Sequence, residues 1–180
     1  MNQLADLEAH GTLIEPATLE IRRILPASVE RVWEYLTDSD LRRQWLASGD
    51  MTMKAGTSFE LVWRNDELSP RPSSPGCRPE GVGDEIRMNS RIIELDPPRR
   101  LVITWQGDGE VSFDLAARGE DTLLTIVHRR LAERGTRLAV SAGWHTHLDI
   151  LLARMNQREP EPFWDGWSRL RAEYEKRFSA

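Results

Sequence analysis

The densest group of chemically versatile side chains lies in the segment WHTHLD, residues 144–149. On a helix His145 and His147 would lie about 200° apart, so they cannot bind one metal ion together. His145 and Asp149 are four residues apart and share a helix face, which we expect to be exposed to solvent. Two such ligands are weak evidence for a metal site. We therefore predict that the protein holds no metal.

His147 falls on the apolar stripe of the same segment, between Trp144 and Leu151. Two interpretations remain open. The favoured one is a core histidine whose polar atoms are satisfied, and the other is an acid, base or ligand-orienting group that faces a cavity. His128 ends an apolar strand, and we expect it to serve packing or a backbone hydrogen bond.

Signatures of catalysis are scarce in this chain. No GxSxG, HExxH or phosphate-binding loop occurs. Cys77 is the only cysteine, which excludes a disulfide within the chain, and its setting SSPGCRPEG indicates an exposed thiol with no histidine partner. Glu60, Arg87 and Asp114 fall on strand faces opposite the apolar ones, where we expect them to be solvated. We predict no catalytic residue and no cofactor, and we favour a protein that is not an enzyme.

Charge and composition narrow the classes of partner. The 180 residues carry 24 Lys and Arg against 29 Asp and Glu, a net charge of −5, with no long basic run to bind a nucleic acid. No apolar stretch approaches the roughly 18 residues of a membrane span. Residues 1–16 have neither a basic start nor an apolar core typical of a signal peptide. We expect a cytoplasmic protein that binds neither nucleic acid nor membrane.

The elements that position these residues follow from hydrophobic periodicity. The pattern predicts a strand over 18–25, a helix over 28–38 capped by Ser28, and a second short helix over 40–46. From Met51 to Leu131 the period changes to two, which predicts a meander: a run of about six antiparallel strands that follows the first strand and the two short helices. The last strand is apolar on both faces, as expected for a central strand under a helix.

Three further segments complete the chain. The loop 66–83 holds four of the ten prolines, and we expect it to be mobile, without assigning it a role. Residues 136–157 carry the longest apolar stripe and predict a helix of roughly 30 Å. A final amphipathic helix has an aromatic stripe that must pack on its own domain, which we favour, or on a second chain. The predicted divisions are an N-terminal arm at 1–16, a ligand-binding domain at 17–157 and a helical extension at 158–180.

This order of elements predicts an α+β fold in which a curled sheet leaves a pocket beside its long helix. The segments PASVERVWEYLTDSDLRRQW, PPRRLVITW, TIVH and GWHTHLDILL, spread between about Ala17 and Gln157, resemble the START-like, helix-grip superfamily, also called SRPBCC or Bet v-like. Within it they resemble the family of the activator of the heat-shock protein 90 ATPase. The resemblance implies a deep hydrophobic cavity between the sheet and the long helix. The matching motif positions are Trp33, Trp45, Trp105, His128, Gly143 and Trp144.

We predict that the protein encloses a hydrophobic small molecule, lipid-like or similar to an aromatic polyketide, because apolar and aromatic pockets are the default ligand sites. The alternative is a co-chaperone-like interaction module related to the ATPase activator, with a protein partner or a homodimer formed through the C-terminal helix. A polyketide-cyclase-like enzyme comes third. The predicted ligand-binding residues are Trp63, Met88, Ile103, Trp105, Phe113, Trp144, His147, Leu148 and Leu151.

Overall fold

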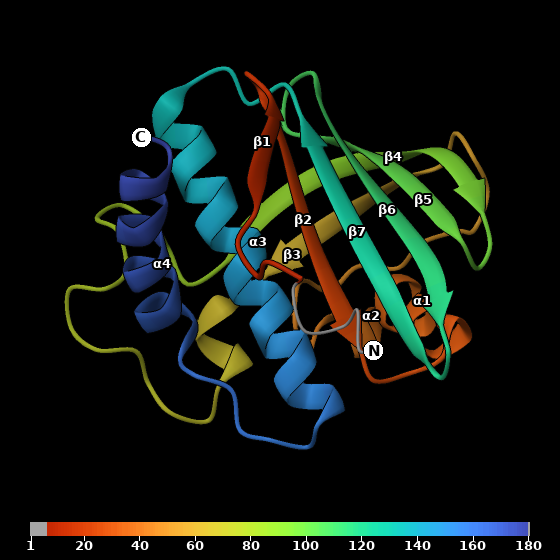
Figure 1. Cartoon of the computed structure of the whole chain (residues 1–180), viewed down its shortest axis with the longest axis horizontal. Coiled ribbons are helices and arrows are strands. Elements are labelled where there is room, and N and C mark those ends of the chain that lie inside the picture. The colour runs from red at the N-terminus through yellow and green to blue at the C-terminus, as the bar shows by residue number, and fades with distance from the viewer. Residues whose placement is uncertain (1–6, 180) are drawn as a thin grey trace.

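Alternating apolar side chains build a curved antiparallel sheet of seven strands, which wraps around a long helix in the computed structural model (Figure 1). The structure describes residues 7–179. The strands are β1 (Thr12–Glu15), β2 (Thr18–Leu25), β3 (Ser58–Trp63), β4 (Ile86–Asp96), β5 (Arg100–Trp105), β6 (Gly109–Arg118) and β7 (Asp121–Arg129).

The strands lie in the order β1-β2-β7-β6-β5-β4-β3. Strand β2, from the start of the chain, therefore pairs with β7, the last strand in the sequence. In the β2–β7 pair Leu19 lies opposite His128 and Ile21 opposite Ile126. Strand β7 is therefore central, as its apolar pattern predicted. It buries side chains on both faces, among them Ile126 and Val127.

Within the N-terminal arm predicted at 1–16, residues 12–15 form strand β1. This strand makes a short hairpin with β2, with Thr12 opposite Glu20. Its side chains are exposed except for the half-buried Leu13, so no alternating apolar pattern marked it. Residues 1–6 of the arm lie outside the described residues.

The helices are α1 (Val29–Thr37), α2 (Ser39–Arg42), the 3₁₀ turn η1 (Asn65–Leu68), α3 (Arg134–Met155) and α4 (Phe163–Arg177). The predicted cap of α1 is confirmed, because the Ser28 side chain accepts a hydrogen bond from the Arg31 amide. The second short helix ends at Arg42 rather than at residue 46. Beyond Arg42 the chain leaves the helix and turns inward, and Trp45 and Leu46 become buried.

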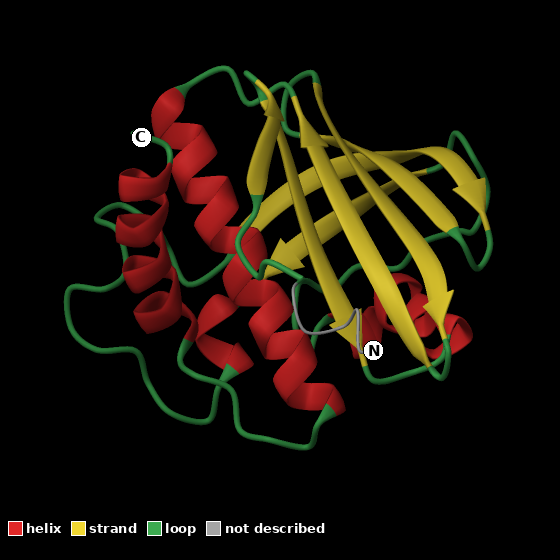
Figure 2. Cartoon of the chain, viewed as in Figure 1, coloured by secondary structure: helices red, strands yellow, loops and turns green. Residues whose placement is uncertain are grey.

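Helix α3 is the middle layer of the molecule, with the sheet on one side and α4 on the other (Figure 2). Toward the sheet it contributes Trp144, Leu148 and Leu151 to the main core. Its opposite face packs on α4, where Leu138 and Ala142 meet two α4 side chains, Leu170 and Tyr174. The aromatic stripe of the C-terminal helix is thus packed within its own chain.

The proline-rich loop runs beside α4 and is bonded to it and to the segment before it. The Ser69 hydroxyl donates to the Pro160 carbonyl at 3.1 Å, the Ser74 amide donates to Asp165 at 2.7 Å, and Arg71 pairs with Glu159 at 2.6 Å. We expected this loop to be mobile, but these bonds fix its position against the C-terminal helix. Among the described helices, none is both long and apolar enough to span a membrane.

Candidate functional site

Aromatic side chains from the sheet and from α3 meet in the interior. The Trp144 ring on α3 lies 5.3 Å from the Trp105 ring on β5 and 5.7 Å from the Phe113 ring on β6, measured between centroids. Trp63 on β3 packs edge-to-face on Trp105 at 5.5 Å. The three tryptophans among the predicted binding residues therefore form one cluster, with centroid distances typical of aromatic pairs.

This aromatic cluster borders a half-open hollow of about 150 Å³, which we name the inner cavity. Apolar cavities of about this size can hold a molecule such as benzene, whereas drug-sized ligands occupy roughly 300–1,000 Å³. The cavity is therefore much smaller than the deep one implied by the family resemblance, because the indole rings fill most of the space between sheet and helix. The inner cavity is lined by Leu46, Trp63, Trp105, Val140, Gly143, Trp144 and His147.

Four of the nine predicted binding residues line the inner cavity: Trp63, Trp105, Trp144 and His147. The other five do not. Ile103, Leu148 and Leu151 are fully buried in the core, Phe113 packs on Trp144, and Met88 is half-buried and accepts a hydrogen bond from the Gln106 amide.

The prediction missed three lining residues. Leu46 follows the end of α2 in an irregular segment, where no periodicity indicates which way a side chain points. Val140 belongs to the predicted apolar stripe of α3, and Gly143 is one of the motif positions. A Cβ atom built on Gly143 would meet no atom within 4 Å, so the missing side chain of this glycine leaves space open at the cavity wall.

His147 is buried beside the inner cavity, and a loop sets its hydrogen bonding. Its Nδ1 lies 2.7 Å from the carbonyl oxygen of Trp45, which can only accept, so Nδ1 carries the proton. Burial lowers the pKa of His147 to about 4, which leaves the ring neutral at neutral pH. The favoured interpretation, a core histidine whose polar atoms are satisfied, therefore holds for Nδ1. No group of residues 7–179 forms a hydrogen bond with Nε2.

His128 supports the aromatic cluster from β7. The Trp144 Nε1–H donates to Nδ1 of His128 at 3.0 Å, so the hydrogen-bond partner is a side chain rather than the expected backbone group. Burial lowers the pKa of His128 to about 4, which keeps the ring neutral and able to accept at Nδ1. This bond satisfies the indole N–H and holds the Trp144 ring against the sheet.

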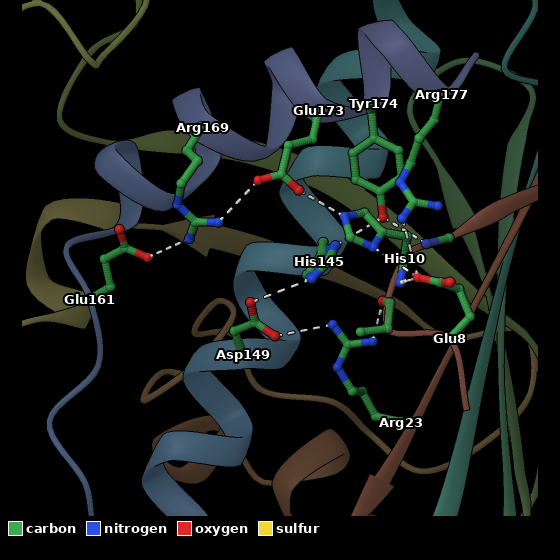
Figure 3. Close-up of polar contacts among 12 residues, drawn as sticks. Glu8, His10, Arg23, His145, Asp149, Glu161, Arg169, Glu173, Tyr174 and Arg177 are labelled. Atoms are coloured by element: carbon green, nitrogen blue, oxygen red, sulfur yellow. Dashed lines mark hydrogen bonds and ion pairs between the residues drawn. The ribbon is translucent and has the colours of Figure 1, made fainter. Parts of the chain in front are cut away.

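A second polar group lies between α3, α4 and the N-terminal segment (Figure 3). The Tyr174 hydroxyl accepts from the Gly11 amide at 2.6 Å and lies 3.0 Å from Nδ1 of His145. Nε2 of His145 faces Asp149 at 3.5 Å, and Asp149 accepts from Arg23 at 3.0 Å. These bonds connect four segments of the chain.

The structure corrects the expectation that His145 faces solvent, since its exposure is only 5%. Helix α4 covers that face of α3 and places Tyr174 against the ring. Burial, together with the nearby Arg23 charge, lowers the pKa of His145 to about 3, so the ring is neutral. Across residues 7–179 no three His, Cys, Asp or Glu side chains come close enough together to hold a metal ion. The group around His145 thus joins segments of the chain and lines no part of the inner cavity.

A larger, open groove of about 800 Å³ lies on the outside, between the proline-rich loop, the start of α3 and α4. Phe163, Trp164 and Trp167 form much of its apolar wall, and Cys77 and Gly135 also line it. We name it the outer groove. It is separate from the inner cavity, and it places the single cysteine beside α4 instead of leaving it fully exposed.

We predict that the Cys77 thiol reacts slowly with iodoacetamide at neutral pH. Partial burial and a hydrogen bond with Asp165 raise the pKa of the thiol, and the thiolate is the reactive form. Alkylation rates measured against pH should yield an apparent pKa above that of a free cysteine, and Asp165→Asn should speed the reaction near pH 8. Rapid alkylation at pH 7 would contradict this prediction.

The fold and the aromatic interior define the class of the protein as helix-grip, with a sheet that encloses a long helix. The family described as activator of Hsp90 ATPase homolog 1-like protein matches residues 26–156, and the chain belongs to this family. A comparison with curated proteins finds no match.

Several solved structures share this fold. A protein from Bordetella parapertussis, solved by NMR, is 32% identical, with a TM-score of 0.78 over 98% of this chain and 94% of that one. CalU16 from Micromonospora echinospora is 25% identical, with a TM-score of 0.63 over 87% of this chain and 84% of that one. DynU16, a protein of the dynemicin biosynthetic locus, shares the fold at 21% identity and a TM-score of 0.61, over 80% of this chain and 49% of that one.

Proposed function

We propose that the protein binds a small, uncharged aromatic molecule in the inner cavity. The observation that carries this proposal is a hollow of about 150 Å³ walled by three tryptophans, which offers rings for stacking and an apolar surface that water solvates poorly. The small volume narrows the predicted class from lipid-like or polyketide-like ligands to a single aromatic ring or the ring end of a larger molecule.

The likeness to DynU16 agrees with this proposal only at the level of the fold, since that protein is described by its place in a biosynthetic locus. The alternative of a dimer or a protein partner at the C-terminal helix has less support. Leu170 and Tyr174 on that helix are buried against α3, so a partner using the same stripe would have to displace α4 from its own domain.

The test uses benzene and toluene as probes, with binding followed by calorimetry and by shifts of the tryptophan indole signals in NMR spectra. We expect both probes to bind, and Gly143→Leu to weaken binding at least about tenfold, because the new side chain enters the cavity that the glycine leaves open. Leucine is also a better helix former than glycine, so we expect α3 to persist.

Gly135→Leu is the matched control. Gly135 lies on the same helix and also has no atom within 4 Å of a Cβ built on it, but it lines the outer groove. We expect this variant to bind both probes as the original chain does. Binding lost in Gly135→Leu and kept in Gly143→Leu would place the ligand in the outer groove. Failure of the unmodified protein to bind either probe would overturn the proposal.

A further inference from the structure

Only one of the two ring nitrogens of His147 forms a hydrogen bond with the described part of the chain. Nδ1 donates its proton to the Trp45 carbonyl at 2.7 Å. In a neutral imidazole the other nitrogen, Nε2, then carries a lone pair and can only accept a hydrogen bond. The position of the Trp45 carbonyl therefore decides which tautomer His147 adopts.

The Nε2 atom has no hydrogen-bond partner among the described residues. Within residues 7–179, the buried side-chain nitrogen and oxygen atoms without a hydrogen-bond partner are Asn65 Oδ1 and Ser141 Oγ. Nε2 of His147 has no hydrogen-bond partner among residues 7–179 and is not one of these two fully buried atoms. The hollow that His147 lines is the inner cavity, although the residue as a whole is only 6% exposed.

No other residue of the cavity wall forms a hydrogen bond with this nitrogen, although Trp63 and Trp105 carry indole N–H groups. Leu46, Val140 and Gly143 contribute hydrocarbon, or no side chain at all. The Trp144 N–H is already bonded to His128. None of the lining residues carries a formal charge, so a carboxylate would meet an acceptor and no cation, which makes its desolvation unfavourable.

We infer that the molecule bound in the inner cavity is a small phenol-like aromatic, whose ring lies among the tryptophans and whose hydroxyl donates a hydrogen bond to Nε2 of His147. This inference rests on the proposed function and names its ligand class. An aromatic hydroxyl is a neutral donor, and a neutral donor pairs with a neutral acceptor without placing a charge in the apolar site. Selectivity follows because a ring without a donor would leave the buried acceptor unpaired.

The loop that carries Trp45 holds the acceptor in place. Trp45 is fully buried, and its Nε1–H donates to the Tyr35 carbonyl at 2.9 Å. Arg42 donates to the carbonyls of Ala47 and Gly49, which follow Trp45 in the chain. The His147 side chain is therefore pre-organised by the fold, and a ligand does not have to order it on binding.

The experiment compares phenol with toluene, which has the same number of heavy atoms and no hydroxyl. In the unmodified protein we expect phenol to bind at least as tightly as toluene, even though the hydration of its hydroxyl in water opposes its transfer to an apolar site. In His147→Phe, which keeps an aromatic ring and removes the acceptor, we expect toluene to bind still and phenol to weaken at least about tenfold relative to toluene.

A second measurement protects the test against a variant that does not fold. In the ¹⁵N spectrum of the unmodified protein, phenol should shift the Nε2 resonance of His147 much more than toluene does. Toluene binding with no binding of phenol would overturn the inference and leave the proposed function intact, as would an unchanged ratio of affinities in His147→Phe. If neither compound bound, both the inference and the proposed function would be wrong.

Discussion

Lowering the pH from 7 to about 4.5 should reduce the free energy of unfolding by several kcal/mol. His128, His145 and His147 are buried and neutral, with pKa values lowered by burial to about 4, about 3 and about 4. In the unfolded chain each has a pKa near 6.5, so below that pH the unfolded state binds more protons than the folded state does. Stability is complete above about pH 6.5 and declines toward the folded pKa values.

The slope can be stated for each proton. A difference of one bound proton between the states changes the free energy of unfolding by about 1.4 kcal/mol per pH unit, so three histidines give up to about 4 kcal/mol per unit near pH 5. Urea unfolding at pH 7.5, 6.5, 5.5 and 5.0 measures this slope. His145→Gln should reduce it by about a third. A free energy of unfolding that stays constant from pH 6.5 to 5 would show that these rings are not held neutral.

Replacing Arg42 by methionine should destabilise the protein by about 3–5 kcal/mol. The guanidinium is only 1% exposed and donates to the carbonyls of Leu36 at 3.0 Å, Thr37 at 3.3 Å, Ala47 at 3.1 Å and Gly49. Burial lowers the pKa of Arg42 to about 10, so it remains charged at neutral pH. Methionine matches the apolar stem but leaves these carbonyls without a donor.

Chemical denaturation measures the loss, and Arg42→Lys serves as the control. Lysine keeps the charge but not the planar fork that reaches both sides of the turn, so we expect an intermediate stability. The affinity for toluene should fall together with stability, because the same turn carries Leu46 and the Trp45 carbonyl. A methionine variant as stable as the original chain would mean that water or a rearranged loop satisfies the carbonyls.

The regular elements were predictable because their signals are local. The first helix of the chain, α1, has its cap at Ser28 and its apolar residues at helical spacing, and it forms where the sequence predicted. The same is true of β2 and of α3, whose stripe packs on the sheet. Strand β1 was not predictable in this way, because its four residues pair with β2 without burying a continuous face.

The candidate site was predictable in outline only. Aromatic residues at alternating or helical spacing indicated that Trp63, Trp105 and Trp144 would meet, and they do. How much space their rings leave depends on the rotamers of all the side chains around them, which no periodicity encodes. The size of the inner cavity and the contribution of Leu46 therefore became visible only in the folded chain.

By itself the sequence determined the α+β class, the central position of the last strand and the face of α3 that meets the sheet, because a periodic apolar pattern must bury one face wherever the chain goes. The tertiary structure alone decided the environments of polar groups. His145 is buried because α4 returns across α3, and Arg42 because the chain turns around it. The tautomer of His147 depends on a carbonyl 102 residues earlier in the chain, and contacts between residues so distant are a property of the packed fold.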